Sequence, residues 1–224
     1  MQRLLLTAAA LIPLAAHAED SASRATGVYI RGGAGVVFGD TLNQDLSYNP
    51  AVIFVTPPAT SKATNLGSGL ALSGAIGFQY ARTRTELEYR RMEPSIDAVA
   101  YAGGAAPGAA VVNNDMTAQA LMSNVYFDLV NSSMLTPYIG VGVGGARVEN
   151  ELGERDAAFA YQGRAGVDVA LGAKLSVGAE YVYFRTLDLK YGPKDFTASG
   201  PAGPRTDGDP FVSSSVMGTV RLVF

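Results

Sequence analysis

Apolar and polar residues alternate with a period of two along most of the chain. This pattern is typical of β-strands whose two faces meet different surroundings. A period of 3.6 residues, which would indicate amphipathic helices, is not found after residue 18. Turn-forming residues divide the pattern into eight predicted strands. These are residues 27–38, 67–80, 83–93, 116–128, 136–148, 158–171, 174–187 and 211–224.

Short and long connections alternate between these strands. The short ones are residues 81–82, 129–135 and 172–173. The long ones are residues 39–66, 94–115, 150–157 and 188–210. An even number of strands, with tight turns at one end and long loops at the other, is typical of bacterial outer-membrane barrels. We therefore predict an all-β fold, an eight-stranded antiparallel transmembrane β-barrel built as an up-and-down meander, with short periplasmic turns and long extracellular loops.

The first 18 residues differ from the rest of the chain. A basic start, residues 1–3, precedes an uncharged apolar run, and Ala16-His17-Ala18 has the small-x-small form of a cleavage site. These features predict a secretory signal peptide over residues 1–18, which leaves a barrel domain over residues 19–224. A retained membrane helix is the alternative, but the apolar run is too short to span a bilayer.

Alternation alone does not say which face of a barrel points outward. In residues 174–187, Leu175 and Tyr181 share one face and Glu180 lies on the other, and a secreted soluble barrel would show the same pattern with its apolar face inward. The signal peptide and the unequal connections favour an apolar face turned to lipid. Aromatic residues near the strand ends favour it too, since they form girdles at membrane interfaces. These residues are Phe38, Phe78, Tyr80, Tyr181, Tyr183 and Phe224.

With the apolar face outward, five basic and five acidic residues point into the lumen. Side chains fill the interior of an eight-stranded barrel, and buried charges must be paired. We expect a structural salt-bridge network; an ion-selectivity filter is the alternative. Glycines 140, 142 and 144 share one face and should leave room for long arginines. The ten charged residues are Arg31, Arg84, Glu86, Glu88, Arg90, Asp128, Arg164, Asp168, Glu180 and Arg221.

Composition removes several classes of function. The chain has no cysteine, and its only histidine, His17, lies in the predicted signal peptide. The net charge of −3 and the scattered basic residues argue against nucleic-acid binding. Residues 140–145 are glycine-rich but lack the following helix of a phosphate loop, and Asp207-Gly208-Asp209 reads as a turn rather than a calcium site. We assign no catalytic, cofactor or metal residue and predict that the protein is not an enzyme.

The last strand carries a family resemblance. Residues 216–224, which read VMGTVRLVF, resemble the C-terminal signal of outer-membrane barrels, with Val220, Leu222 and Phe224 at its alternating positions. The resemblance implies recognition by the barrel assembly machinery. Residues 123–128, 136–144 and 178–184 resemble further strands of small barrels. The chain is similar to the opacity-like or surface-antigen family of eight-stranded porin-like outer-membrane proteins.

This resemblance implies a location in the bacterial outer membrane and a role carried by exposed loops. We expect a non-enzymatic structural, adhesin-like or antigen-like surface protein that exposes residues 39–66, 94–115 and 188–210. A small porin that passes ions or small solutes through the lumen is the alternative. A barrel hydrolase is disfavoured because such enzymes rely on histidine. Expected partners are outer-membrane lipid, lipopolysaccharide, and a host or surface ligand bound by the loops, and we expect a monomer.

Overall fold

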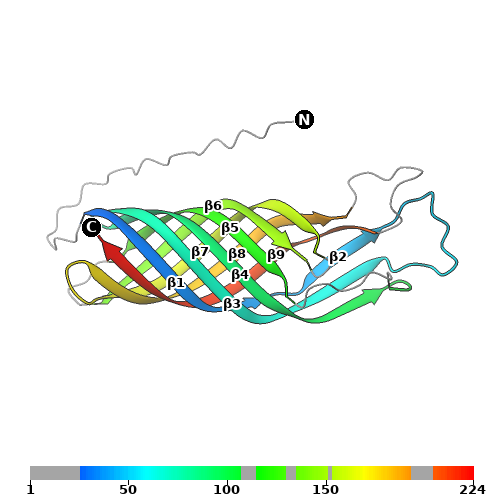
Figure 1. Cartoon of the computed structure of the whole chain (residues 1–224), viewed down its shortest axis with the longest axis horizontal. Helices are drawn as coiled ribbons and strands as arrows, with labels where there is room; N and C mark the ends of the chain where they lie inside the picture. The colour runs from blue at the N-terminus through cyan, green and yellow to red at the C-terminus, as the bar shows by residue number, and fades with distance from the viewer. Residues whose placement is uncertain (1–25, 107–114, 130–134, 151–152, 193–203) are drawn as a thin grey trace, which may run out of the picture.

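The structure is a computed structural model that describes residues 26–106, 115–129, 135–150, 153–192 and 204–224. Within these residues the chain forms nine antiparallel strands (Figure 1). They are β1 (Gly27–Gly39), β2 (Leu42–Ser47), β3 (Ser61–Tyr80), β4 (Thr83–Ala102), β5 (Thr117–Asp128), β6 (Leu135–Glu149), β7 (Arg155–Ala170), β8 (Leu175–Tyr191) and β9 (Arg205–Val223). The predicted signal peptide lies outside the described residues. No helix long and apolar enough to span a membrane occurs in the described part of the chain.

The sheet closes into a barrel because β1 pairs with β9 as well as with β3. The strands from β3 to β9 pair in chain order, as an up-and-down meander requires. β2, which raises the number of strands to nine, does not add a position to the barrel. β2 pairs with β3 and β9 in the register that β1 already has, so it continues β1 after a break at Asp40 and Thr41. The barrel is therefore eight-stranded, as the sequence predicts, with β1 and β2 counted as one interrupted strand.

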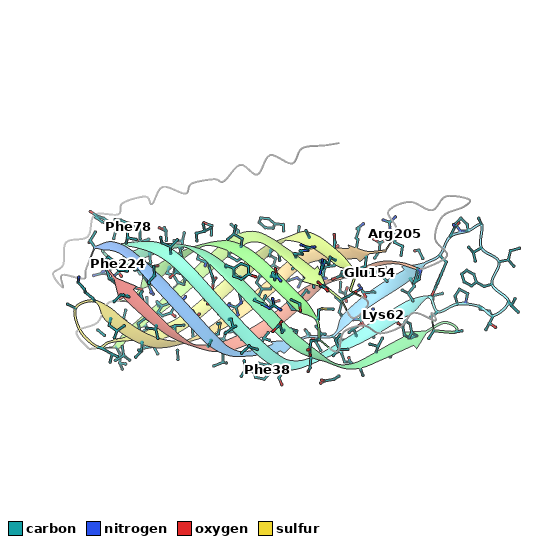
Figure 2. All side chains as sticks on the ribbon, in the orientation of Figure 1. Phe38, Lys62, Phe78, Glu154, Arg205 and Phe224 are labelled. Carbon is teal, nitrogen blue, oxygen red and sulfur yellow. The ribbon has the colours of Figure 1, made fainter. Side chains whose placement is uncertain are left out.

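Large apolar side chains cover the outer surface of the barrel, and polar side chains lie inside it. Phe38, Phe78 and Phe224 point away from the barrel wall (Figure 2). Because a closed barrel pairs its backbone groups internally, such an apolar band is compatible with lipid. This arrangement confirms the predicted orientation. Other exposed members of the band are Val28, Ile30, Leu70, Leu72, Ile76, Leu87, Leu121, Ile139, Val141, Tyr181, Val216 and Leu222.

The two ends of the barrel differ. At the end we call the turn end, β3 and β4 are joined by Ala81 and Arg82, and the C-terminal Phe224 lies close to the start of β1. At the opposite end, the loop end, β2, β3, β4, β8 and β9 extend well beyond the rest of the barrel wall (Figure 1). A sheet therefore projects from the barrel at the loop end only.

The long connections predicted over residues 39–66, 94–115 and 188–210 are wrong in extent. β2 and the start of β3 occupy much of the first, β4 continues to Ala102, and β8 and β9 shorten the third. Asp207-Gly208-Asp209, predicted as a turn, lies in β9, where Gly208 pairs with Gln44. One face of this extension is still buried, but it includes polar residues such as Gln44, Lys62 and Thr64. The two faces therefore differ little in hydrophobicity, and the period-two pattern is weak there.

Candidate functional site

The barrel interior contains all ten of the charged residues that the sequence places in the lumen. Each retains less than a tenth of its accessible surface. They come from β1, β4, β5, β7, β8 and β9, so the network joins walls that lie across the barrel from one another. Buried charges of this kind are stable only when opposite charges and hydrogen bonds compensate them. The contacts fall into two linked groups.

The first group centres on Arg31 and Arg164. Arg31 Nη2 lies 2.6 Å from Glu180 Oε2, and Arg31 Nη1 lies 3.6 Å from Glu86 Oε2. Arg164 bridges Glu180 and Glu88, with N–O distances of 2.5 and 2.6 Å. Glu180 thus sits between two guanidinium groups that belong to different walls of the barrel. Removing it would leave both arginines with one fewer buried counter-charge.

The second group lies nearer the turn end and centres on Arg84. Its two terminal nitrogens lie 2.8 Å from Asp128 Oδ1 and 3.0 Å from Asp168 Oδ2. Asp168 also receives Arg221 Nη2 at 3.2 Å, and Arg221 donates a second hydrogen bond to Gln79. A cavity of about 200 Å³ opens beside these residues at the turn end, where Lys174 forms part of its rim. The charged groups close the barrel just above that opening.

Three buried tyrosines belong to the network, although the sequence analysis did not assign them to it. Tyr29 and Tyr126 donate hydrogen bonds to the two carboxylate oxygens of Glu86, at 2.9 and 2.8 Å. Tyr138 donates to Glu180 at 3.1 Å, and the Arg84 guanidinium lies 4.5 Å from its ring centroid. The period-two pattern could have identified Tyr29, because it lies two residues before Arg31 and therefore on the same inward face of β1.

The glycine face of β6 makes room for inward side chains of both neighbouring strands. Glycines 140, 142 and 144 pair directly with Tyr126, Asn124 and Met122 of β5. A Cβ at Gly140 or Gly142 would overlap the side chain of its partner on β5, and a Cβ at Gly144 would overlap the backbone oxygen of Leu121. On the other side, Gly140 pairs directly with Arg164 of β7, whereas Gly142 and Gly144 pair with Gln162 and Ala160. The expected arginine from a neighbouring strand is therefore found at Gly140 and not at the other two positions.

Arg90 lies apart from the ion pairs. Among the described residues, its contact is a 2.7 Å hydrogen bond from Nη2 to Ser215 Oγ, and no carboxylate oxygen lies within salt-bridge distance. The Arg90 nitrogens Nε and Nη1 make no hydrogen bond within the described part of the chain. The next inward residue of β4 toward the loop end is Met92. Arg90 is therefore the member of the network that lies nearest the loop end on β4.

Beyond Arg90 toward the loop end, apolar side chains fill the interior. We call this layer the apolar tier. The period-two pattern does not predict this layer, because methionine and phenylalanine on the inner face remove the contrast between a polar and an apolar face. Phe184 and Phe211 meet edge to face with their ring centroids 6.2 Å apart. The tier consists of Val37, Met92, Phe184 and Phe211, all nearly inaccessible to solvent.

The predicted assembly signal lies on the outer face of β9. Val220, Leu222 and Phe224 are exposed, at 51%, 36% and 66% of their surface. β9 forms the closing seam with β1, and the backbone N–H of Phe224 donates to Val28 O at 3.0 Å. The three side chains are therefore accessible from the lipid side, next to the seam. Their recognition by assembly machinery remains a prediction.

Comparison with known proteins gives a family and a fold. Residues 35–200 match the surface antigen family. The outer membrane protein OprG from Pseudomonas aeruginosa has a TM-score of 0.62 at 17% identity, over 90% of this chain and 98% of that one. Neisserial surface protein A has a TM-score of 0.50 at 15% identity, over 88% and 97%. No curated protein matches the sequence.

The structural similarity establishes the barrel fold, and the family match covers most of the chain, including the strands that contribute most of the interior network. Together they confirm the resemblance and the location predicted from the strand motifs. The chain belongs to the surface antigen family of bacterial outer-membrane β-barrel proteins.

Proposed function

We propose that this protein is a non-enzymatic surface barrel that binds other molecules through its loop end, in the manner of an adhesin or surface antigen. Short turns of outer-membrane barrels face the periplasm, so the loop end is extracellular. The proposal is supported by the segment between β2 and β3, which forms the extracellular tip. Ile53 and Val55 are 94% and 102% exposed there. Large apolar side chains held in water are typical of contact surfaces for partners.

The tip is held by contacts on both sides of these residues. Tyr48 and Phe54 meet edge to face, with ring centroids 5.1 Å apart. Ala59 and Ala105 connect the segment to the end of the β4 hairpin through backbone hydrogen bonds of 2.8 and 2.9 Å. A surface already held in one arrangement loses less conformational entropy on binding. The tip therefore suits recognition of a partner protein more than a loose loop would.

The filled interior supports a role at the surface rather than in transport. The charged groups and the apolar tier follow one another along the barrel axis, and eight-stranded barrels have interiors just wide enough for side chains. A second candidate is a small pore for ions. The cavity at the periplasmic mouth favours it, because Gln79, Asp168 and Arg221 line a polar entrance there. A pathway would still have to pass the apolar tier.

The interior carboxylates and the distribution of possible metal ligands support a non-enzymatic role. The buried carboxylates of the interior are engaged by arginines and tyrosines. Within the described residues, no three histidine, cysteine or acidic side chains gather in a way that could hold a metal ion. The interior carboxylates are therefore not available as a general base for a substrate.

Attachment of whole cells tests the proposed role. A non-adherent bacterial host displaying the protein would be allowed to settle on epithelial monolayers. Ile53→Ser combined with Val55→Ser should reduce the number of attached cells several-fold. Ala51→Ser in the same segment is the matched control and should attach like the wild type. Equal attachment of all three strains, with equal display shown by surface labelling, would refute binding through this tip.

A further inference from the structure

Arginines follow the apolar band on the outer surface at the extracellular side. On β4 the outward residue after Tyr89 is Arg91, and on β8 the outward residue after Tyr183 is Arg185. β6 and β7 carry Arg147 and Arg155 near their extracellular ends. We call Arg91, Arg147, Arg155 and Arg185 the arginine arc. Arg91, Arg147 and Arg155 lie beyond the last large apolar outward residue of their strands, whereas Arg185 is followed by the outward Leu187.

The strand register brings two members of the arc to the same row of the sheet. Arg91 on β4 and Arg147 on β6 are both direct cross-strand partners of Gln119 on β5. Their backbones are thus two strand spacings apart, about 10 Å. Side chains as long as arginine reach across such a distance. One headgroup lying over Gln119 can therefore contact both guanidinium groups.

The arc is accessible and only partly neutralised. The side chains of Arg91 and Arg155 are 44% and 53% exposed. Arg91 pairs with Glu93, and Arg155 pairs with Glu149 at 2.5 Å. Arg147 is exposed and makes no ion pair among the described residues. Glu93 and Glu149 lie one outward position further from the membrane than Arg91 and Arg147, so these two arginines come first at the membrane edge, while Arg155 is level with Glu149.

The arc occupies one side of the barrel. On β1 the residue beyond the band is Asp40, which follows the outward Phe38 and the strand end. On β9 the outward positions near the band are Ser214 and Val212. Dispersed solubilising charge would surround the whole barrel, whereas an arc over β4 to β8 fits a ligand that binds at one place.

We propose that the arginine arc binds the phosphate groups of lipopolysaccharide in the outer leaflet. Guanidinium groups bind phosphate through paired hydrogen bonds in a fixed planar geometry. Basic side chains next to a bilayer are also attracted by anionic headgroups. This inference uses the outer face of the barrel wall and is independent of the proposed role of the extracellular tip. A partner protein at the tip could exist without it, and the converse also holds.

The test compares binding of lipid A with two phosphates and of the same lipid A with both phosphates removed. The full protein, purified in detergent, would be titrated with each lipid and the dissociation constants measured by native mass spectrometry. The double variant Arg91→Gln, Arg147→Gln removes two charges from the arc. The matched control, Arg82→Gln with Lys174→Gln, removes two charges from the periplasmic turns. Heat-modifiable gel migration would verify that each protein is folded.

The wild type and the control should bind the phosphorylated lipid at least about tenfold more tightly than the dephosphorylated one. The arc variant should lose most of that preference. Equal binding of the two lipids by the wild type would overturn the proposal, as would an equal loss in the control variant. Competition by millimolar inorganic phosphate would also overturn it, because the site would then bind a free anion rather than a lipid headgroup.

Discussion

Gly140 of β6 lies directly opposite Tyr126 of β5, and a Cβ at Gly140 would overlap the Tyr126 ring. The tyrosine in turn donates a hydrogen bond to Glu86 at 2.8 Å, and the Arg84 guanidinium lies 5.0 Å from the tyrosine ring centroid. An absent side chain on one strand thus allows the ion network to form on its neighbours. This relationship makes the strand β6 a sensitive place to test the interior.

Gly140→Val should destabilise the barrel by about 1–3 kcal/mol, the usual effect of overfilling a packed interior. The Tyr126 ring would have to move and loosen its contact with Glu86. Urea unfolding of the protein in lipid vesicles measures the change. Gly145→Ala on the same strand is the control, because a Cβ there meets no atom within 4 Å. A similar loss in both variants would contradict the interior packing described above.

Arg84 and Arg90 are both fully buried, yet their replacement by methionine should have different effects. Arg84→Met leaves Asp128 and Asp168 without their shared counter-charge and should cost about 3–5 kcal/mol. Arg90→Met removes a hydrogen bond to Ser215 and places an apolar side chain next to Met92. We expect a cost below about 1 kcal/mol or a small gain. Equilibrium unfolding compares the two, and an equal cost would show that Arg90 has a counter-charge after all.

Because the interior is filled, we expect single-channel recordings of the refolded protein in a planar bilayer to show no conductance steps. The apolar tier should prevent a continuous water path, and the charged groups below it are held by one another. Folding would be verified by heat-modifiable gel migration. Regular conductance steps from the wild type that change when Arg164→Gln is introduced would support the pore instead.

Val141→Arg should destabilise the protein by about 2–4 kcal/mol, because this outward side chain, 67% exposed from the barrel, lies in the middle of the apolar band. Gln119→Arg on the next strand lies at the level of the arginine arc and should cost no more than about 1 kcal/mol. Urea titration of both variants in the same vesicles checks the depth dependence. Equal costs would place the membrane edge elsewhere.

The sequence predicted the barrel walls and the inward parity of the charges because lipid and a narrow interior impose a strict period of two on residues such as Glu86, Glu88 and Arg90. It did not predict which pairs form. Arg31 meets Glu180 across the barrel, and strand tilt and curvature decide that contact. The extracellular extension of β3 and β4 was also missed, since alanine, serine and threonine there show little contrast between faces. The monomeric state and the expected partners stay predictions.

The charged interior has a consequence for the register in which the first and last strands pair. Arg31 belongs to the first strand, whereas Glu86 and Glu180 arrive with β4 and β8, and the β1–β9 seam is paired only when the last strand is in place. Sliding that seam by two residues would keep every side chain on its correct face but move Arg31 away from Glu180 on β8, while its pairing through β3 would keep it near Glu86 on β4. A mispaired seam would leave uncompensated charge buried in the barrel interior. Electrostatics therefore enforces the closing register, which apolar patterning alone leaves degenerate.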